Sequence, residues 1–134
     1  MSAFSNLAAQ AVLPLDAYKL DDLERSAQRA DQRLLSCDFI TANSKDDVLE
    51  QIGRAFAFPK HFGKNLDALF DCLTELKPVA EAQAPGFVVI LKNIPNGKAY
   101  DVEERNDLLD VFREAGDHFH DHQLAFRVFY SVQH

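Results

Sequence analysis

The sequence has little that could cross-link the chain or carry it into a membrane. Among its 134 residues are only two cysteines, Cys37 and Cys72, and no apolar run approaches the roughly 18 residues that cross a bilayer. Both cysteines lie in largely apolar segments, which is typical of buried thiols in a reducing compartment, although one bridge between them is chemically open. A secretory signal has a basic stretch before its apolar residues, and the start of this sequence has none. We therefore expect a cytoplasmic protein without a membrane partner.

Motifs that carry enzymatic chemistry are also missing. The chain has no glycine-rich phosphate loop, no nucleophile elbow and no framework of histidine and cysteine metal ligands. His118, His120 and His122 alternate along the chain, but they fall in the predicted turn before the last strand, where exposed neutral histidines are typical. We therefore predict no catalytic residues, no metal site and no cofactor. The pair Asp67 and Asp71 leaves one alternative open, a small acid-dependent phosphodiester hydrolase.

Basic residues are few relative to acidic ones. Fourteen Lys and Arg stand against 21 Asp and Glu, so the formal net charge is -7. This charge disfavours nucleic acid and anionic membranes as partners and suits a basic protein. The excess is local, because residues 65–114 contain ten acids and five bases, whereas residues 1–64 contain nine acids and eight bases. Solubility alone would not require this concentration of charge.

The order of apolar patterns predicts one α/β domain. Apolar spacing indicates helices and strands that alternate along the chain, and this order favours a three-stranded, mainly parallel sheet packed with helices. The main strands are expected at 34–42, 87–91 and 124–132. The helices are expected at 19–32, from the cap at Ser44 to Phe58-Pro59, at 65–76 and at 102–115. A short edge strand is also expected at 11–15, before the first of these helices.

Residue types at the helix ends support two of these boundaries. Ser44 is a favoured first cap, and Asp47 follows three residues later, as in a capping box. Gly116 follows the apolar pattern of 102–115, and glycine commonly ends helices. The pattern therefore predicts helix ends at Ser44 and Gly116.

Two of the predicted helices carry acids away from their apolar sides. In 65–76 the leucines repeat at helical spacing, and Asp67 and Asp71 fall on the opposite side, with Phe70 at the border. In 102–115 the acids form a stripe without a base, and its members are Glu103, Asp107, Asp110 and Glu114. An ordinary solvated face would explain either helix alone. Two such faces in one short block favour a binding surface for a basic partner.

One long segment resembles a known family. The run Phe58-Pro-Lys-His-Phe-Gly-Lys-Asn-Leu-Asp-Ala-Leu-Phe-Asp-Cys-Leu-Thr-Glu-Leu76 is similar to the barstar family, the intracellular inhibitors of secreted barnase-type ribonucleases. A second match, Val111-Phe-Arg-Glu-Ala115, follows in the same order. The resemblance spans roughly residues 34 to 132 and implies a barstar-like fold, no enzymatic activity and a basic ribonuclease as partner. It divides the chain into an N-terminal extension, residues 1–33, which holds the short strand and the first helix, and a barstar-like domain, residues 34–134.

The resemblance also implies which residues meet that partner. Asp71 would be the central acid, held against cations that normally bind the phosphates of RNA. The implied partner-binding residues are His61, Phe62, Gly63, Asn65, Asp67, Phe70, Asp71, Thr74, Glu75 and Glu114. His61 stands where the family usually has tyrosine, Phe70 where tryptophan is common and Lys64 where an acid is frequent. These departures leave a second partner open, a different basic toxin against which the chain would act as a barstar-fold binding module or immunity protein.

Overall fold

The computed structural model describes residues 3–59 and 62–134. The elements along the described chain are β1 (Gln10–Pro14), the short 3-10 helix η1 (Leu15–Ala17), α1 (Leu20–Arg29), β2 (Arg33–Asp38), α2 (Lys45–Ala55), α3 (Leu66–Thr74), β3 (Gly86–Ile94), α4 (Val102–Asp121) and β4 (Ala125–Val132). Within the described ranges, no helix is both long enough and apolar enough to cross a membrane.

The strands form one parallel sheet in the order β1-β4-β3-β2. The prediction of an α/β fold with a mainly parallel sheet is confirmed. The short edge strand expected at 11–15 is confirmed as β1. The predicted number of three strands in the sheet is wrong, because β1 pairs in register with Phe126–Tyr130 of β4 and adds a fourth strand. β3 lies inside the sheet, and its residues from Gly86 to Leu91 are buried, as its apolar run predicts.

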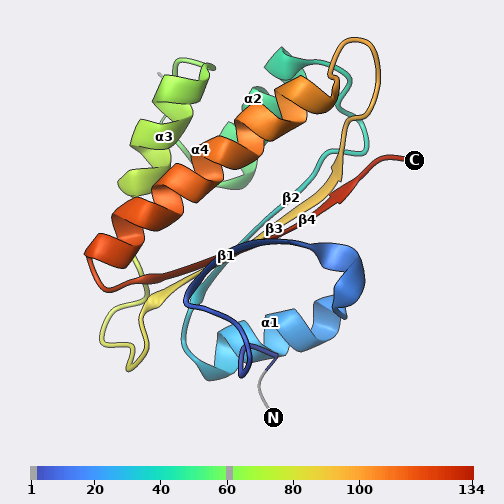
Figure 1. The fold of residues 1–134 in the computed structure, drawn as a ribbon. Helices are drawn as coiled ribbons and strands as arrows, with labels where there is room; N and C mark the ends of the chain where they lie inside the picture. Colours follow the sequence, from blue (N-terminus) through green and yellow to red (C-terminus); the bar gives the residue numbers. More distant parts are fainter. Residues whose placement is uncertain (1–2, 60–61) are drawn as a thin grey trace.

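Helices cover both faces of the sheet (Figure 1). Helices α2, α3 and α4 lie on one face, and α1 lies on the other. Side chains of β3 alternate between the two: Phe87, Val89 and Leu91 belong to the larger core cluster under α2–α4, whereas Val88 and Ile90 belong to the cluster under α1. The segment before β2 therefore closes the second face of the sheet.

Arg127 of β4 ties that N-terminal segment to the sheet. Its side chain is nearly buried, and its Nε donates a hydrogen bond to the carbonyl oxygen of Ala8 at 3.0 Å. Its guanidinium carbon lies 4.6 Å from the centre of the Phe4 ring, a cation–π contact. Burial lowers the pKa of Arg127. The carbonyl and the ring thus compensate a cation that is largely removed from water.

Helix α4 is longer than predicted. It continues to Asp121, and Gly116 lies buried within it rather than at its end. A Cβ at Gly116 would lie 3.1 Å from Cγ of Gln10 and 3.5 Å from Cδ2 of Phe126. This glycine is therefore explained by the close approach of α4 to β1 and β4, and its prediction as a helix end is wrong.

Because α4 extends to Asp121, the three histidines lie elsewhere than predicted. His118 and His120 lie in the last turns of α4 instead of the turn before β4, and His122 is the residue that caps the helix. The rings of His118 and His122 are 4.4 Å apart, and Nδ1 of His122 is hydrogen-bonded to the carbonyl oxygen of His118 at 2.8 Å. Among residues 3–59 and 62–134, no group of three or more His, Cys, Asp or Glu side chains is arranged to hold a metal ion.

Both cysteines are free. Cys37 is buried in β2, and burial, with a smaller contribution from the charge of Asp38, raises the pKa of its thiol to about 12. Cys72 of α3 is only partly buried. Cys37 is therefore protonated at neutral pH and behaves as a small apolar side chain.

Candidate functional site

Helix α3 begins at a well-defined cap. The side-chain oxygen of Asn65 accepts a hydrogen bond from the backbone N–H of Ala68 at 2.8 Å, and its Nδ2 donates to the carbonyl oxygen of Gly63 at 3.3 Å. Behind this cap, Leu69 and Leu73 are buried in the core between α3 and α4. The cap and the buried leucines fix the rotation of α3 and hence the direction of its polar side.

The outer side of α3 is acidic and open to solvent. Asp67, Asp71 and Glu75 are exposed, as the helical pattern predicts for the first two. Among the described residues, no side chain forms a hydrogen bond or an ion pair with these three carboxylates. Phe70 is half-buried beside them and packs against the core. Within the described ranges, this surface therefore combines three carboxylates that have no side-chain partner with one half-buried aromatic residue.

Burial and the negative charge on α3 both contribute to a raised pKa of the Cys72 thiol. Burial is the main cause of its raised pKa, and the carboxylates of Glu75 and Asp71 add to the shift. Thr74 lies on the same side of α3, but its hydroxyl donates to the carbonyl oxygens of Phe70 and Asp71 at 3.0 and 3.1 Å. The helix backbone thus occupies the hydroxyl proton of Thr74, whose oxygen can still accept a hydrogen bond from a partner.

A shallow depression lies at the start of this acidic side. It is lined by Lys45, Asn65, Leu66, Asp67, Ala68 and Asp71. Lys45 is the first residue of α2, and within the described chain it makes no ion pair with Asp67 or Asp71. Sequence patterns did not identify Lys45, because only the packing of α2 beside α3 brings it to this depression.

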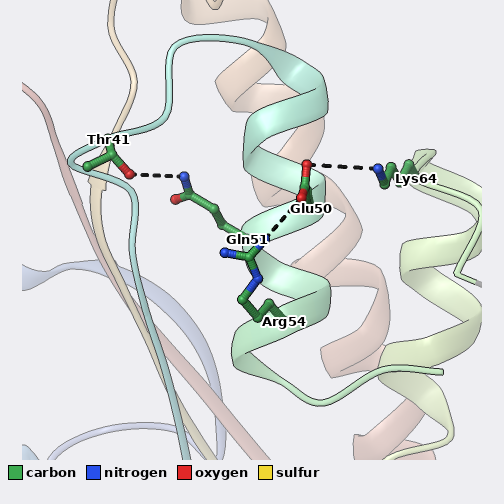
Figure 2. Close-up of polar contacts among 5 residues, drawn as sticks. All are labelled: Thr41, Glu50, Gln51, Arg54 and Lys64. Carbon is green, nitrogen blue, oxygen red and sulfur yellow. Dashed lines mark hydrogen bonds and ion pairs between the residues drawn. The ribbon is translucent and has the colours of Figure 1, made fainter. Parts of the chain in front are cut away.

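The segment before α3 is attached to α2 (Figure 2). Lys64 Nζ lies 3.8 Å from Oε2 of Glu50, whose other oxygen lies 3.0 Å from the Arg54 guanidinium. Phe62 is half-buried, and its ring centre lies 5.4 Å from that of Phe58. Gly63 is exposed. His61, which the resemblance placed in the binding surface, lies outside the described residues.

The acidic stripe on α4 is confirmed only in part. Glu103, Asp107 and Glu114 are exposed. Asp110 is paired with Arg113 at 2.7 Å, so the prediction of a stripe without a base is wrong at that position, because a side chain three residues later on a helix reaches back to it. Glu114 has no hydrogen bond or ion pair to α3 within the described chain, and it is linked to the acidic surface only through the packing of α4 against α3.

The chain is similar to a known protein family. A family model described as Barstar (barnase inhibitor) matches residues 32–131. The match runs from just before β2 into β4 and contains every residue predicted to bind the partner. No relative was found among curated proteins. The match covers most of the chain, and the protein therefore belongs to the barstar family of barnase inhibitors.

Proposed function

We propose that this protein inhibits a basic ribonuclease of the barnase type by placing the acidic side of α3 in the active site of the enzyme. Barstar family proteins are non-enzymatic inhibitors, so the hydrolase alternative loses its support. The observation that carries the proposal is the exposed group of Asp67, Asp71 and Glu75, whose charge no described side chain neutralises. The inhibitor would act in the cytoplasm.

The chemistry of such an active site suits these carboxylates. A ribonuclease gathers Arg, Lys and His side chains around the phosphates of RNA, and carboxylates form short charge-assisted hydrogen bonds with the same cations. The capped and packed α3 already holds Asp67 and Asp71 in place. Binding therefore has only the side chains of these residues to order and not the backbone that carries them. No cofactor or metal is needed for this mode of inhibition.

The remaining predicted residues take supporting positions. Asp71 is assigned the central contact and Phe70 the apolar contact beside it. The surrounding surface comprises His61, Phe62, Gly63, Asn65, Asp67, Thr74, Glu75 and Glu114. These assignments rest on the family pattern and on the exposure of α3 and its preceding segment.

A second partner, a different basic toxin, is favoured by one specific feature. Lys64 is an exposed base next to the acidic side, where the family frequently has an acid, and Lys45 lies at the edge of the same surface. Both cations would repel a partner that carries a base opposite them. If the chain binds such a toxin but leaves barnase-type enzymes active, the proposed binding surface is correct and the proposed ribonuclease partner is wrong.

Added salt is expected to slow association with a barnase-type ribonuclease. The exposed acids attract a basic enzyme over long distances, and salt screens this attraction. Between about 0.02 and 0.5 M NaCl, the association rate constant should fall about tenfold or more, with a smaller change in dissociation. Stopped-flow mixing measures both rates.

Two variants distinguish the effect of charge on the acidic side of α3 from the effect of net charge. Each variant removes one negative charge. Asp67→Asn should flatten the salt dependence, whereas Glu24→Gln should leave it unchanged, because Glu24 lies on α1 at the opposite face of the sheet. Association that is independent of salt, or equally altered by both variants, would contradict the proposed steering.

A further inference from the structure

A glycine in the interior of α2 lies directly against the ring of Phe62. A Cβ at Gly53 would lie 2.9 Å from Cδ2 and 3.3 Å from Cε2 of that ring, closer than the roughly 3.5 Å of carbon atoms in ordinary contact. Gly53 does not have a positive φ, so backbone conformation does not explain it. Glycine also forms helices less well than alanine. The space required by Phe62 is therefore the physical reason for a glycine at this position.

The ring of Phe62 has limited freedom to move away. It packs against the main core and makes an edge contact with Phe58, which in turn makes one with Phe56 at a distance of 5.8 Å between ring centres. The backbone N–H of Phe62 donates to the carbonyl oxygen of Pro59 at 2.9 Å. A methyl group at Gly53 would displace a ring that these neighbours hold.

Phe62 is also the first described residue of the segment that leads into α3. Lys64 is attached to α2 through Glu50, and Asn65 then caps α3. Helix α2 therefore holds this segment at two points, at Gly53 through the ring and at Glu50 through the ion pair. The exposed Gly63 lies between these two points, and Asp67 lies just beyond them.

We infer that Gly53 is a positioning residue for the partner-binding surface: it leaves the space in which Phe62 fixes the segment Phe62–Asn65 on α2. The inference rests on the proposed function, because it concerns the same surface. Gly53 is not assigned a contact with the partner. It acts through Phe62, so its effect on binding should vanish when the ring is removed.

The test is a double-mutant cycle measured with a barnase-type ribonuclease. Gly53→Ala is introduced into the wild-type protein and into the Phe62→Ala variant. In the wild-type background we expect about tenfold faster dissociation with little change in association, and in the Phe62→Ala background a change below about twofold. Gly97→Ala is the matched control, because a Cβ at Gly97 meets nothing within 4 Å, and it should change neither background.

Amide hydrogen exchange in the free protein supplies a second measurement that needs no partner. Gly53→Ala should speed exchange at the backbone N–H of Phe62, which donates to the carbonyl oxygen of Pro59, about tenfold, while the N–H groups of β3 keep their protection. If the wild-type protein fails to inhibit the ribonuclease, the proposed function is wrong, and exchange still tests the positioning. Equal effects of Gly53→Ala in both backgrounds, or unchanged dissociation and unchanged exchange, would overturn the inference.

Discussion

Replacing Asp71 with alanine is expected to raise the Kd for a barnase-type ribonuclease by about 30-fold or more, mainly through faster dissociation. Asp71 is exposed on α3 and has no ion pair with any described residue of its own chain. In the complex its carboxylate would face cations that binding removes from water. Alanine would leave those cations without a partner, which costs more than the loss of one exposed contact. Inhibition titrations and surface binding kinetics measure the change.

Asp21→Ala is the matched control for Asp71→Ala. Asp21 is an exposed acid in the first turn of α1, on the opposite face of the sheet, and its removal changes net charge by the same amount. Its Kd should stay within about twofold of wild type, because an exposed charge far from the interface is largely screened. Both variants should change the free energy of unfolding by no more than about 0.5 kcal/mol. If both variants weaken binding to the same extent, or if neither weakens it, the assignment of the central contact to Asp71 is wrong.

Replacing Leu23 with alanine is expected to lower the free energy of unfolding by about 2–5 kcal/mol. Leu23 of α1 is completely buried and belongs to the core cluster that includes Val88, Ile90 and Phe129 of the sheet. Alanine would leave a cavity in the smaller of the two cores. Because residue 23 precedes the family match at 32–131, this change tests whether the N-terminal segment stabilises the fold. Urea denaturation measures the effect.

Glu24→Ala provides the comparison for Leu23→Ala. Glu24 is the next residue of α1 and is exposed, so its removal should change the free energy of unfolding by less than about 0.5 kcal/mol. Below its unfolding transition, Leu23→Ala should bind the ribonuclease like wild type, because α1 and α3 lie on opposite faces of the sheet. We propose that residues 1–33 are an extension that covers the domain formed by residues 34–134. Wild-type stability in Leu23→Ala would contradict this role.

Local periodicity explains why the acidic side of α3 could be predicted. Leucines at helical spacing placed Leu69 and Leu73 inside and Asp67 and Asp71 outside, and the structure confirms this division. The cap at Ser44 was predictable for the same reason, because its hydroxyl and the N–H of Asp47 are only three residues apart. Features that depend on residues within one or two helical turns of each other can therefore be predicted from the sequence pattern.

Features that depend on distant segments were missed. The short strand near the N-terminus was predicted, but its place in the sheet was not, because it pairs with β4, more than 110 residues later in the chain, and no local pattern specifies that pairing. Gly116 has the residue type of a helix end, but contact with Gln10 and Phe126 explains it. The attachment of Phe62 to Gly53 likewise depends on the packing of α2 beside the segment before α3. A glycine inside a helical pattern was the only available signal of that contact.

The most direct test of the proposed inhibition is competition for the active site of the enzyme. The protein is titrated into a barnase-type ribonuclease with and without a nucleoside 3′-phosphate bound at that site, and RNA cleavage and binding are followed together. We predict that cleavage stops at one equivalent of protein and that the apparent Kd rises in proportion to the nucleotide concentration. A ternary complex of enzyme, nucleotide and protein, or continued cleavage by the saturated complex, would contradict the placement of the acidic side of α3 in the active site.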